Sequence, residues 1–172
     1  PDENPVPETH PLAPVSVYGM TKAWQTMLMT QMAASGLDVL MARPFTFSGP
    51  GFSPQLFVGR VEKQIIDYKA GRIDRIKVGP LGAIRDYLDV REAIDLFDAI
   101  MTLGQTGEVY HIGSGKPVAM RELLNRMLME HGLADALVEE APGNTNRQGL
   151  DVPVIYADMT KTRSLMKTRR PD

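Results

Sequence analysis

Tyr18-Gly19-Met20-Thr21-Lys22 opens an apolar segment from which the architecture of this 172-residue chain can be deduced. Hydrophobic residues follow it at helical spacing as far as Ser35-Gly36, where glycine is a natural end for a helix. Residues 38–43 then form a short apolar run that ends at Pro44, which is typical of a buried parallel strand. A helix followed by such a strand is the repeating step of a doubly wound α/β sheet.

Tyr18 and Lys22 are four residues apart, which places both side chains on one face of the predicted helix. An ammonium group beside a phenol stabilises the phenolate, most strongly where water is excluded. A phenol in that setting can act as a general acid or base. The alternative interpretation is a surface pair in which Lys22 is solvated and Tyr18 only packs.

The rest of the chain alternates between helical and strand patterns, which supports the same α/β class. Asp158 is a plausible cap for the last predicted helix. Residues 141–151 are polar and rich in turn formers. The predicted helices are residues 56–70, 90–103, 119–131 and 158–166, and the predicted strands are residues 73–78 and 109–112.

Composition excludes several classes of function. The net charge is −2, and binding to phosphate backbones usually needs a concentrated basic face, so no nucleic-acid partner is expected. With 0 cysteines the chain has no disulfide or thiolate metal site, which suits a cytoplasmic location. His10, His111 and His131 lack metal-ligand spacing, so no metal is expected. No apolar run approaches the roughly 20 residues of a membrane-spanning helix, so no membrane partner is expected either.

Five segments, in their order along the chain, resemble one enzyme family. They are residues 8–22, 43–51, 79–90, 107–115 and 147–153, the third of which contains Arg85-Asp86-Tyr87-Leu88-Asp89. They resemble the extended short-chain dehydrogenases/reductases of the NAD-dependent epimerase/dehydratase type, which act on nucleotide sugars. The likeness is greatest to the GDP-mannose branch, the GDP-mannose 4,6-dehydratases and the GDP-4-keto-6-deoxy-mannose reductases. Thr46 departs from the family pattern, which usually has asparagine there.

The resemblance implies the C-terminal part of a Rossmann-type doubly wound parallel sheet plus a smaller α/β substrate-binding domain. Residues 1–50 are then expected to be the C-terminal remnant of the dinucleotide-binding domain. Residues 51–172 are expected to be mainly the substrate-binding domain, with some segments returning to the Rossmann sheet. The glycine-rich turn that holds the cofactor pyrophosphate in such enzymes does not occur in this sequence. We therefore expect this chain to be the C-terminal portion of a longer enzyme.

The same resemblance implies roles for individual residues. Tyr18 would be the catalytic acid/base at the C4 oxygen of the sugar, and Lys22 would assist it while holding the nicotinamide ribose. For the motif residues, the ordinary alternatives are surface ion pairs and core packing. For Asp86 and Asp89, they are helix capping or orientation of Arg85. The implied contacts to NAD or NADP in the full-length enzyme are Tyr18, Lys22, Pro44, Phe45 and Thr46, and those to the nucleotide-diphosphate sugar are Arg60, Val78, Arg85 and Arg147.

The reaction implied first is NAD(P)-dependent reduction of the 4-keto group of a GDP-4-keto-6-deoxy-hexose. A nucleotide-sugar 4,6-dehydratase or a C4 epimerase would use the same scaffold, and both remain open. A further alternative is a catalytically inactive binding fragment that lacks the cofactor half. The apolar stripe of Met20, Trp24 and Met27 suits core packing or, as in related enzymes, a homodimer formed through the catalytic helix.

Overall fold

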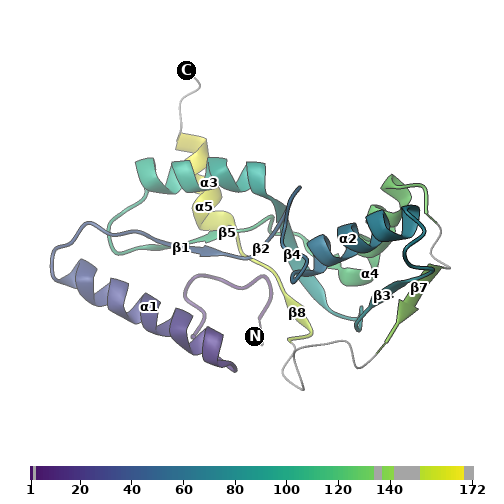
Figure 1. The fold of residues 1–172 in the computed structure, drawn as a ribbon. Coiled ribbons are helices and arrows are strands. Elements are labelled where there is room, and N and C mark those ends of the chain that lie inside the picture. The colour runs from purple at the N-terminus through teal and green to yellow at the C-terminus, as the bar shows by residue number, and fades with distance from the viewer. Residues whose placement is uncertain (2, 134–136, 142–151, 169–172) are drawn as a thin grey trace. The chain divides into compact units, whose positions relative to one another are not determined.

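The computed structural model describes residues 1, 3–133, 137–141 and 152–168 (Figure 1). The chain divides into two compact units, each assembled from separate segments. Unit 1 comprises Pro1–Phe47, Asp86–Lys116 and Ile155–Asp172, and unit 2 comprises Ser48–Arg85 and Pro117–Val154. The chain passes between the units within or beside four short strands, which are β2 (Thr46–Ser48), β4 (Ile84–Asp89), β6 (Pro117–Ala119) and β8 (Val154–Ile155).

Helix α1 (Val17–Ala34) of unit 1 is the helix predicted from the Tyr18 segment. Ser16 is its N-cap, and the Ser16 hydroxyl accepts a hydrogen bond from the Gly19 N–H at 3.0 Å. A side-chain acceptor at this position satisfies one of the free N–H groups of the first turn. Gly36 follows the helix with a φ of 92°, a conformation that strongly favours glycine. Both ends of α1 are thus set by local sequence.

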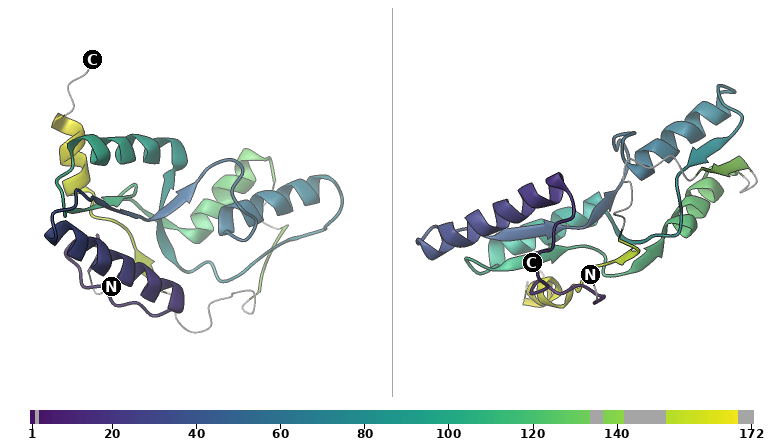
Figure 2. Two further views of the ribbon diagram at one scale, coloured as in Figure 1. Left: turned by 60° about the vertical axis from the view of Figure 1, so that its left-hand side comes forward. Right: turned by 90° about the horizontal axis from the view of Figure 1, so that it is seen from below.

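Two parallel strands form the centre of unit 1. Strand β1 (Met41–Pro44) pairs with β5 (Val109–Ile112), with Met41 opposite Val109. Helix α3 (Val90–Leu103) lies on one side of this pair and α1 on the other (Figures 1 and 2). The buried cluster between α3 and the strands consists of Leu88, Ala93, Ile100, Tyr110 and Ile112, and burial of a large apolar side chain contributes about 1.5–3 kcal/mol.

Unit 2 packs two helices with two strands. Helices α2 (Phe57–Lys69) and α4 (Met120–Glu130) contact each other, and α2 also contacts β3 (Ile76–Val78). Strand β3 pairs in parallel with β7 (Val138–Glu140), which puts Val78 opposite Glu140. The buried residues of these two helices are Val58, Gly59, Val61 and Ile65 of α2 and Met120, Leu123, Leu124, Met127 and Leu128 of α4.

The predicted helices and strands are confirmed, with changes at their ends. Helix α3 and strand β5 have the predicted bounds, whereas β1 begins at Met41 rather than at residue 38. Its partner β5 starts only at Val109, after a turn at Gly107 with a φ of 82°, so the ladder cannot begin earlier. Helix α5 (Thr160–Thr168) is capped by Asp158, as predicted, because the carboxylate accepts a hydrogen bond from the Thr160 N–H.

Several short strands were not predicted from the sequence. Strand β4 contains two aspartates and an arginine among its six residues, and Asp86 faces inward as Leu88 does. A buried carboxylate interrupts the apolar alternation by which a strand is recognised. Most of the polar segment 141–151 lies outside the described residues.

Two further properties concern only the described ranges given above. Within them, no helix combines the length and apolarity needed to cross a membrane. The same ranges contain no group of three or more histidine, cysteine or carboxylate side chains placed to hold a metal ion.

Candidate active site

Tyr18 and Lys22 lie one turn apart near the start of α1. The Lys22 ammonium nitrogen is 5.6 Å from the centroid of the Tyr18 ring and donates a hydrogen bond to the Gln25 side chain at 3.1 Å. The Tyr18 side chain is open to solvent, with 72% of the residue exposed. A phenol and an ammonium group are therefore presented together on an accessible helix face. Their mutual attraction is weak in water and becomes stronger when a bound molecule displaces that water.

Pro44 is the last residue of β1, Phe45 follows it, and Thr46 begins β2. In open parallel sheets, ligands bind beyond the carboxyl ends of the strands, so the position suits the predicted cofactor contacts. The Phe45 N–H donates to the Ile112 carbonyl at 2.9 Å, and the Phe45 ring packs edge-on against His111 with 5.2 Å between centroids. Phe45 is therefore held by its neighbours, whereas Thr46 is exposed.

A buried polar cluster that the sequence analysis missed lies beside Phe45. It joins Glu8, Arg43 and His111: the Glu8 carboxylate accepts from the backbone N–H of His111 at 3.1 Å, and the Glu8 carbonyl accepts from Arg43 Nη1 at 3.0 Å. Arg43 Nε and His111 Nδ1 are buried and have no hydrogen-bond partner among the described atoms. His111 Nδ1 lies 3.9 Å from the Glu8 carboxylate. The cluster ties the segment before α1 to both central strands.

Burial dominates the charge balance of this cluster. It lowers the pKa of His111, an effect that the Glu8 carboxylate and a hydrogen bond to the backbone of Asp158 oppose and that the Arg43 guanidinium reinforces. Burial likewise lowers the pKa of Arg43, against the attraction of Glu8. The neutral imidazole is therefore favoured in the folded chain at neutral pH.

This shift predicts a pH-dependent stability. Because the folded pKa of His111 lies below the unfolded value of about 6.5, the unfolded state binds more protons as pH falls through that range. The free energy of unfolding should therefore decrease below about pH 7, by up to about 1.4 kcal/mol per pH unit. Urea denaturation of the full-length protein at pH values from about 7.5 to about 5 measures this decrease. His111→Gln should make the free energy of unfolding depend less on pH, whereas His131→Gln, at an exposed position, should leave this dependence as it is. Equal pH dependence in the two variants would contradict the assignment to His111.

Asp86 forms a second buried polar centre in unit 1. Only 1% of the residue is exposed. One carboxylate oxygen accepts from the Ser114 N–H and hydroxyl at 2.6 and 2.8 Å, and the other accepts from the N–H groups of Gly115 and Ala157 at 3.0 and 3.1 Å. A Cβ on Gly113 would lie 2.7 Å from this carboxylate, so glycine is needed there. Asp86 therefore folds the 113–115 turn and links it to the C-terminal segment.

Asp89 caps a helix, one of the two roles that the sequence suggested for the aspartates of this motif. Its carboxylate accepts from the Arg91 N–H at 2.8 Å at the start of α3. Hydrogen bonds from the Arg91 side chain and backbone lower the pKa of Asp89 to about 2. The pair is largely solvent-exposed, so it serves the helix end and adds little to stability.

The predicted substrate residues of unit 2 occupy different environments. Val78 is buried, with 2% exposed, and its carbonyl accepts from the Ala141 N–H. Arg85 Nη1 donates to the Ile84 carbonyl at 2.8 Å and approaches the Pro153 carbonyl at 3.4 Å. Arg60 donates to the Gln55 carbonyl at 3.0 Å, just before its own helix. Val78 and Arg85 lie on either side of one turn, residues 79–83, whereas Arg60 lies in α2. Arg147 lies outside the described residues.

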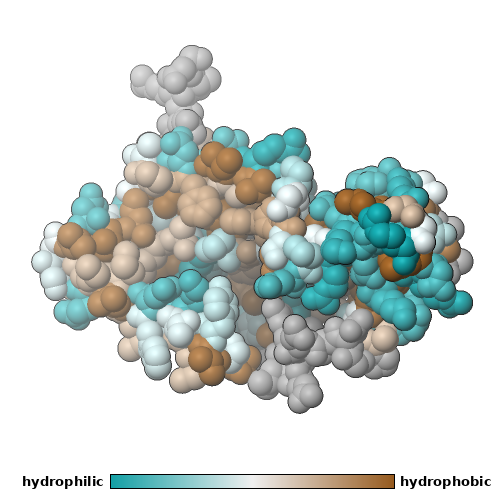
Figure 3. All heavy atoms as spheres, in the orientation of Figure 1, coloured by the Kyte–Doolittle hydropathy of each residue, from teal (hydrophilic) through white to brown (hydrophobic). Residues whose placement is uncertain are grey.

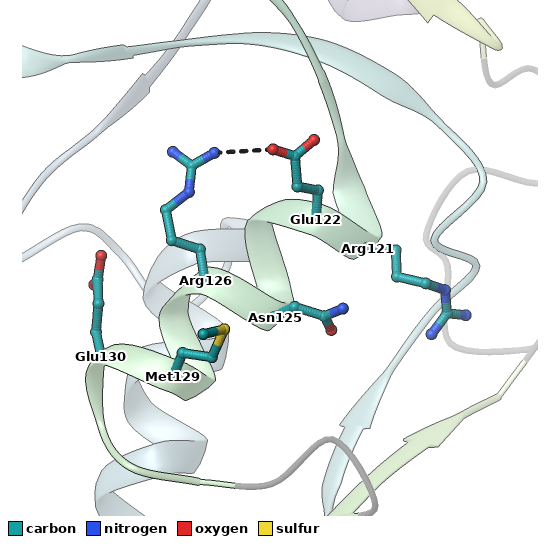
Figure 4. Close-up of a pocket in the computed structure, with 6 residues that line it drawn as sticks. All are labelled: Arg121, Glu122, Asn125, Arg126, Met129 and Glu130. Carbon is teal, nitrogen blue, oxygen red and sulfur yellow. Dashed lines mark hydrogen bonds and ion pairs between the residues drawn. The ribbon is translucent and has the colours of Figure 1, made fainter.

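A shallow depression lies on the exposed side of α4 and contains none of the predicted site residues (Figure 4). Arg126 and Glu122 pair across one helical turn, whereas the Arg121 side chain extends in a different direction. The lining residues are Arg121, Glu122, Asn125, Arg126, Met129 and Glu130.

Comparison with known protein families gives a match over nearly the whole chain. The model of the family described as GDP-mannose 4,6 dehydratase matches residues 1–167. A GDP-6-deoxy-D-mannose reductase of Pseudomonas aeruginosa is 31% identical over 116 residues, which are 67% of this chain and 38% of the relative. A dTDP-glucose 4,6-dehydratase of Streptomyces antibioticus is 30% identical over 152 residues, 84% of this chain and 43% of the relative. The chain thus spans less than half the length of either relative.

Solved structures agree with this match at the level of the fold. The structure of RMD from Pseudomonas aeruginosa with NADPH superposes with a TM-score of 0.85 at 23% identity, covering 96% of this chain and 55% of that one. A UDP-glucose 4-epimerase of Thermotoga maritima with UDP-glucose gives a TM-score of 0.78 at 26% identity, covering 93% and 50%. The predicted α/β fold, part of a Rossmann-type enzyme, is confirmed.

Proposed function

Because this chain belongs to the GDP-mannose 4,6-dehydratase family, as its motifs predicted, we propose that the full-length protein is an NAD(P)-dependent nucleotide-sugar oxidoreductase. The observation that carries the proposal is the Tyr18–Lys22 pair, presented on the open face of a capped helix. The preferred reaction is reduction of the 4-keto group of a GDP-4-keto-6-deoxy-hexose. The likeness to the Pseudomonas reductase supports this choice.

The residues of this chain contribute proton transfer and positioning. NADPH or NADH, when bound, supplies the hydride that reduces C4. Tyr18 gives its phenolic proton to the C4 oxygen, so that the carbonyl becomes an alcohol, and the phenolate left behind is stabilised by the Lys22 ammonium. Both side chains are exposed donors, as contacts to ribose and sugar hydroxyls require. Pro44, Phe45 and Thr46 complete the cofactor contacts at the end of β1.

The substrate is held, in this proposal, by residues of unit 2. Guanidinium groups suit diphosphate because they offer paired donors and a permanent charge. Arg85 would supply them after releasing its contacts to two backbone carbonyls. Val78 would contribute through the strand end that it occupies rather than through its buried side chain. The proposed substrate contacts are Arg60, Val78, Arg85 and Arg147.

The test of this proposal uses the full-length protein with GDP-4-keto-6-deoxy-mannose and NADPH. Loss of NADPH absorbance that depends on the sugar is expected. A protein that oxidises no NADPH, with NADH tried in parallel, is not a reductase of this sugar.

A second candidate is a 4,6-dehydratase or a C4 epimerase on the same scaffold, favoured by the match to a dTDP-glucose 4,6-dehydratase over 84% of the chain. A dehydratase would convert a nucleotide hexose to its 4-keto-6-deoxy product without net use of the cofactor. An epimerase would interconvert two sugars, also without net change. Analysis of products from GDP-mannose, dTDP-glucose and UDP-glucose separates these outcomes from reduction.

We also propose a homodimer formed through α1. Met20, Trp24 and Met27 are 42%, 61% and 65% exposed, so core packing within this chain does not account for the stripe. Hydrophobic residues reach the surface around α1 in Figure 3, and no residue of this helix is buried. A helix gains most of its stability by packing an apolar face, and a second copy would provide that contact. Sedimentation of the full-length protein measures the oligomeric state, and a monomer would contradict the proposal.

A further inference from the structure

The turn formed by residues 79–83 links two of the proposed substrate contacts, Val78 at the end of β3 and Arg85 in β4. Leu81 in the middle of the turn is buried, with 3% exposed. The Ala83 carbonyl accepts a hydrogen bond from the Met120 N–H at 3.0 Å, where α4 begins. The shape of this turn therefore sets how Val78 and Arg85 are placed with respect to each other.

Glu140 holds the turn from the side of β7. Its backbone lies opposite Val78 in the parallel ladder, and the next residue, Ala141, donates its N–H to the Val78 carbonyl at 2.9 Å. One oxygen of the Glu140 side chain accepts a hydrogen bond from the Leu81 N–H at 3.0 Å. The other forms an ion pair with Arg121 of α4. Strand β7, the turn and α4 thus meet at one carboxylate.

We propose that Glu140, oriented by Arg121, is a positioning residue that fixes the 79–83 turn and through it the nucleotide-diphosphate contacts of Val78 and Arg85. This inference rests on the proposed function for its effect on substrate binding. Neither Glu140 nor Arg121 touches the substrate in this account.

The two contacts of the Glu140 carboxylate differ in strength, which distinguishes a positioning role from a role in the stability of the whole chain. The Glu140–Arg121 pair is half exposed, with side-chain exposures of 36% and 50%, and such pairs add little to the free energy of unfolding. A hydrogen bond from a partly buried N–H to a carboxylate is stronger, and its loss leaves the Leu81 N–H without an acceptor. A loosened turn weakens the binding of the substrate and of the transition state by the same amount, which raises KM and leaves kcat unchanged.

The chain offers a matched control on the same helix. Arg126 has the same charge as Arg121, is 55% exposed and pairs with Glu122 rather than with β7 (Figure 4). We therefore compare Glu140→Ala, Arg121→Gln, Arg121→Lys and Arg126→Gln in the full-length protein. Steady-state kinetics with the nucleotide sugar and hydrogen exchange at the Leu81 amide are the two readouts.

Glu140→Ala should raise KM about 10-fold with kcat within about 2-fold, and should speed exchange at Leu81. Arg121→Gln should show a smaller change in the same direction, Arg121→Lys should restore it, and Arg126→Gln should resemble wild type. Equal KM values for Glu140→Ala and Arg126→Gln would overturn the inference, as would unchanged Leu81 exchange. If Glu140→Ala does not fold, the comparison of Arg121→Gln with Arg121→Lys decides. If the wild type turns over no nucleotide sugar, the proposed function fails, and Leu81 exchange alone decides the positioning role.

Discussion

Tyr18→Phe in the full-length protein is expected to lower kcat by at least about 10²-fold, within the usual contribution of an acid/base group. The substitution keeps the ring, and with it the contact to the Lys22 ammonium at 5.6 Å, and removes only the hydroxyl. Because Tyr18 is 72% exposed, the melting temperature should stay close to that of the wild type. Steady-state kinetics and a thermal melt together separate lost chemistry from lost folding.

Tyr68→Phe provides the control for this experiment, since Tyr68 is also a helical tyrosine but lies on α2 in unit 2. Its kcat should remain within about 2-fold of the wild type, as expected of a residue outside the chemistry. If Tyr18→Phe and Tyr68→Phe turn over at the same rate, Tyr18 is not the acid/base group.

Asp86→Ala is expected to destabilise the protein by at least about 3 kcal/mol, a large part of the roughly 5–15 kcal/mol of a typical domain. The substitution leaves three backbone N–H groups, those of Ser114, Gly115 and Ala157, without their acceptor. Each such buried donor costs about 1–3 kcal/mol. Asp86→Asn should also destabilise, because an amide NH₂ would have to face donors on one side. Urea denaturation of the full-length protein measures both.

The control for Asp86 lies three residues away in the same motif. Asp89 caps α3 from a more exposed position, so Asp89→Ala should cost only about 1 kcal/mol. Similar losses for the two alanine variants would show that Asp86 does not hold the 113–115 turn as described.

The sequence predicted the helices well because their signals are local. Ser16, Gly36 and Asp158 mark helix ends through hydrogen bonds or backbone angles within a few residues. The family, too, could be identified from motifs in order. Strands β2, β6, β7 and β8 could not be found, since two or three residues carry too little periodicity, and β4 was missed because it buries a carboxylate.

The candidate site was predicted only in part. The placement of Tyr18 beside Lys22 follows from helix geometry and is found in the structure, while their roles and those of the arginines stay predictions. The organising roles of Glu8, Asp86 and Glu140 were not expected. A charged residue is usually exposed, and only the folded structure shows the partners that hold it in place.

Local patterns in the chain are sufficient to specify an α/β architecture, the ends of α1 and a phenol and an ammonium group on one helix face, because these depend on neighbours within four residues. The hydrogen bonds of the Asp86 and Glu140 carboxylates form only on folding, because they join residues 28, 71 and 59 positions apart. Sequence spacing carries no signal over such separations, and the packing of strands, turns and helices brings these groups within hydrogen-bond reach.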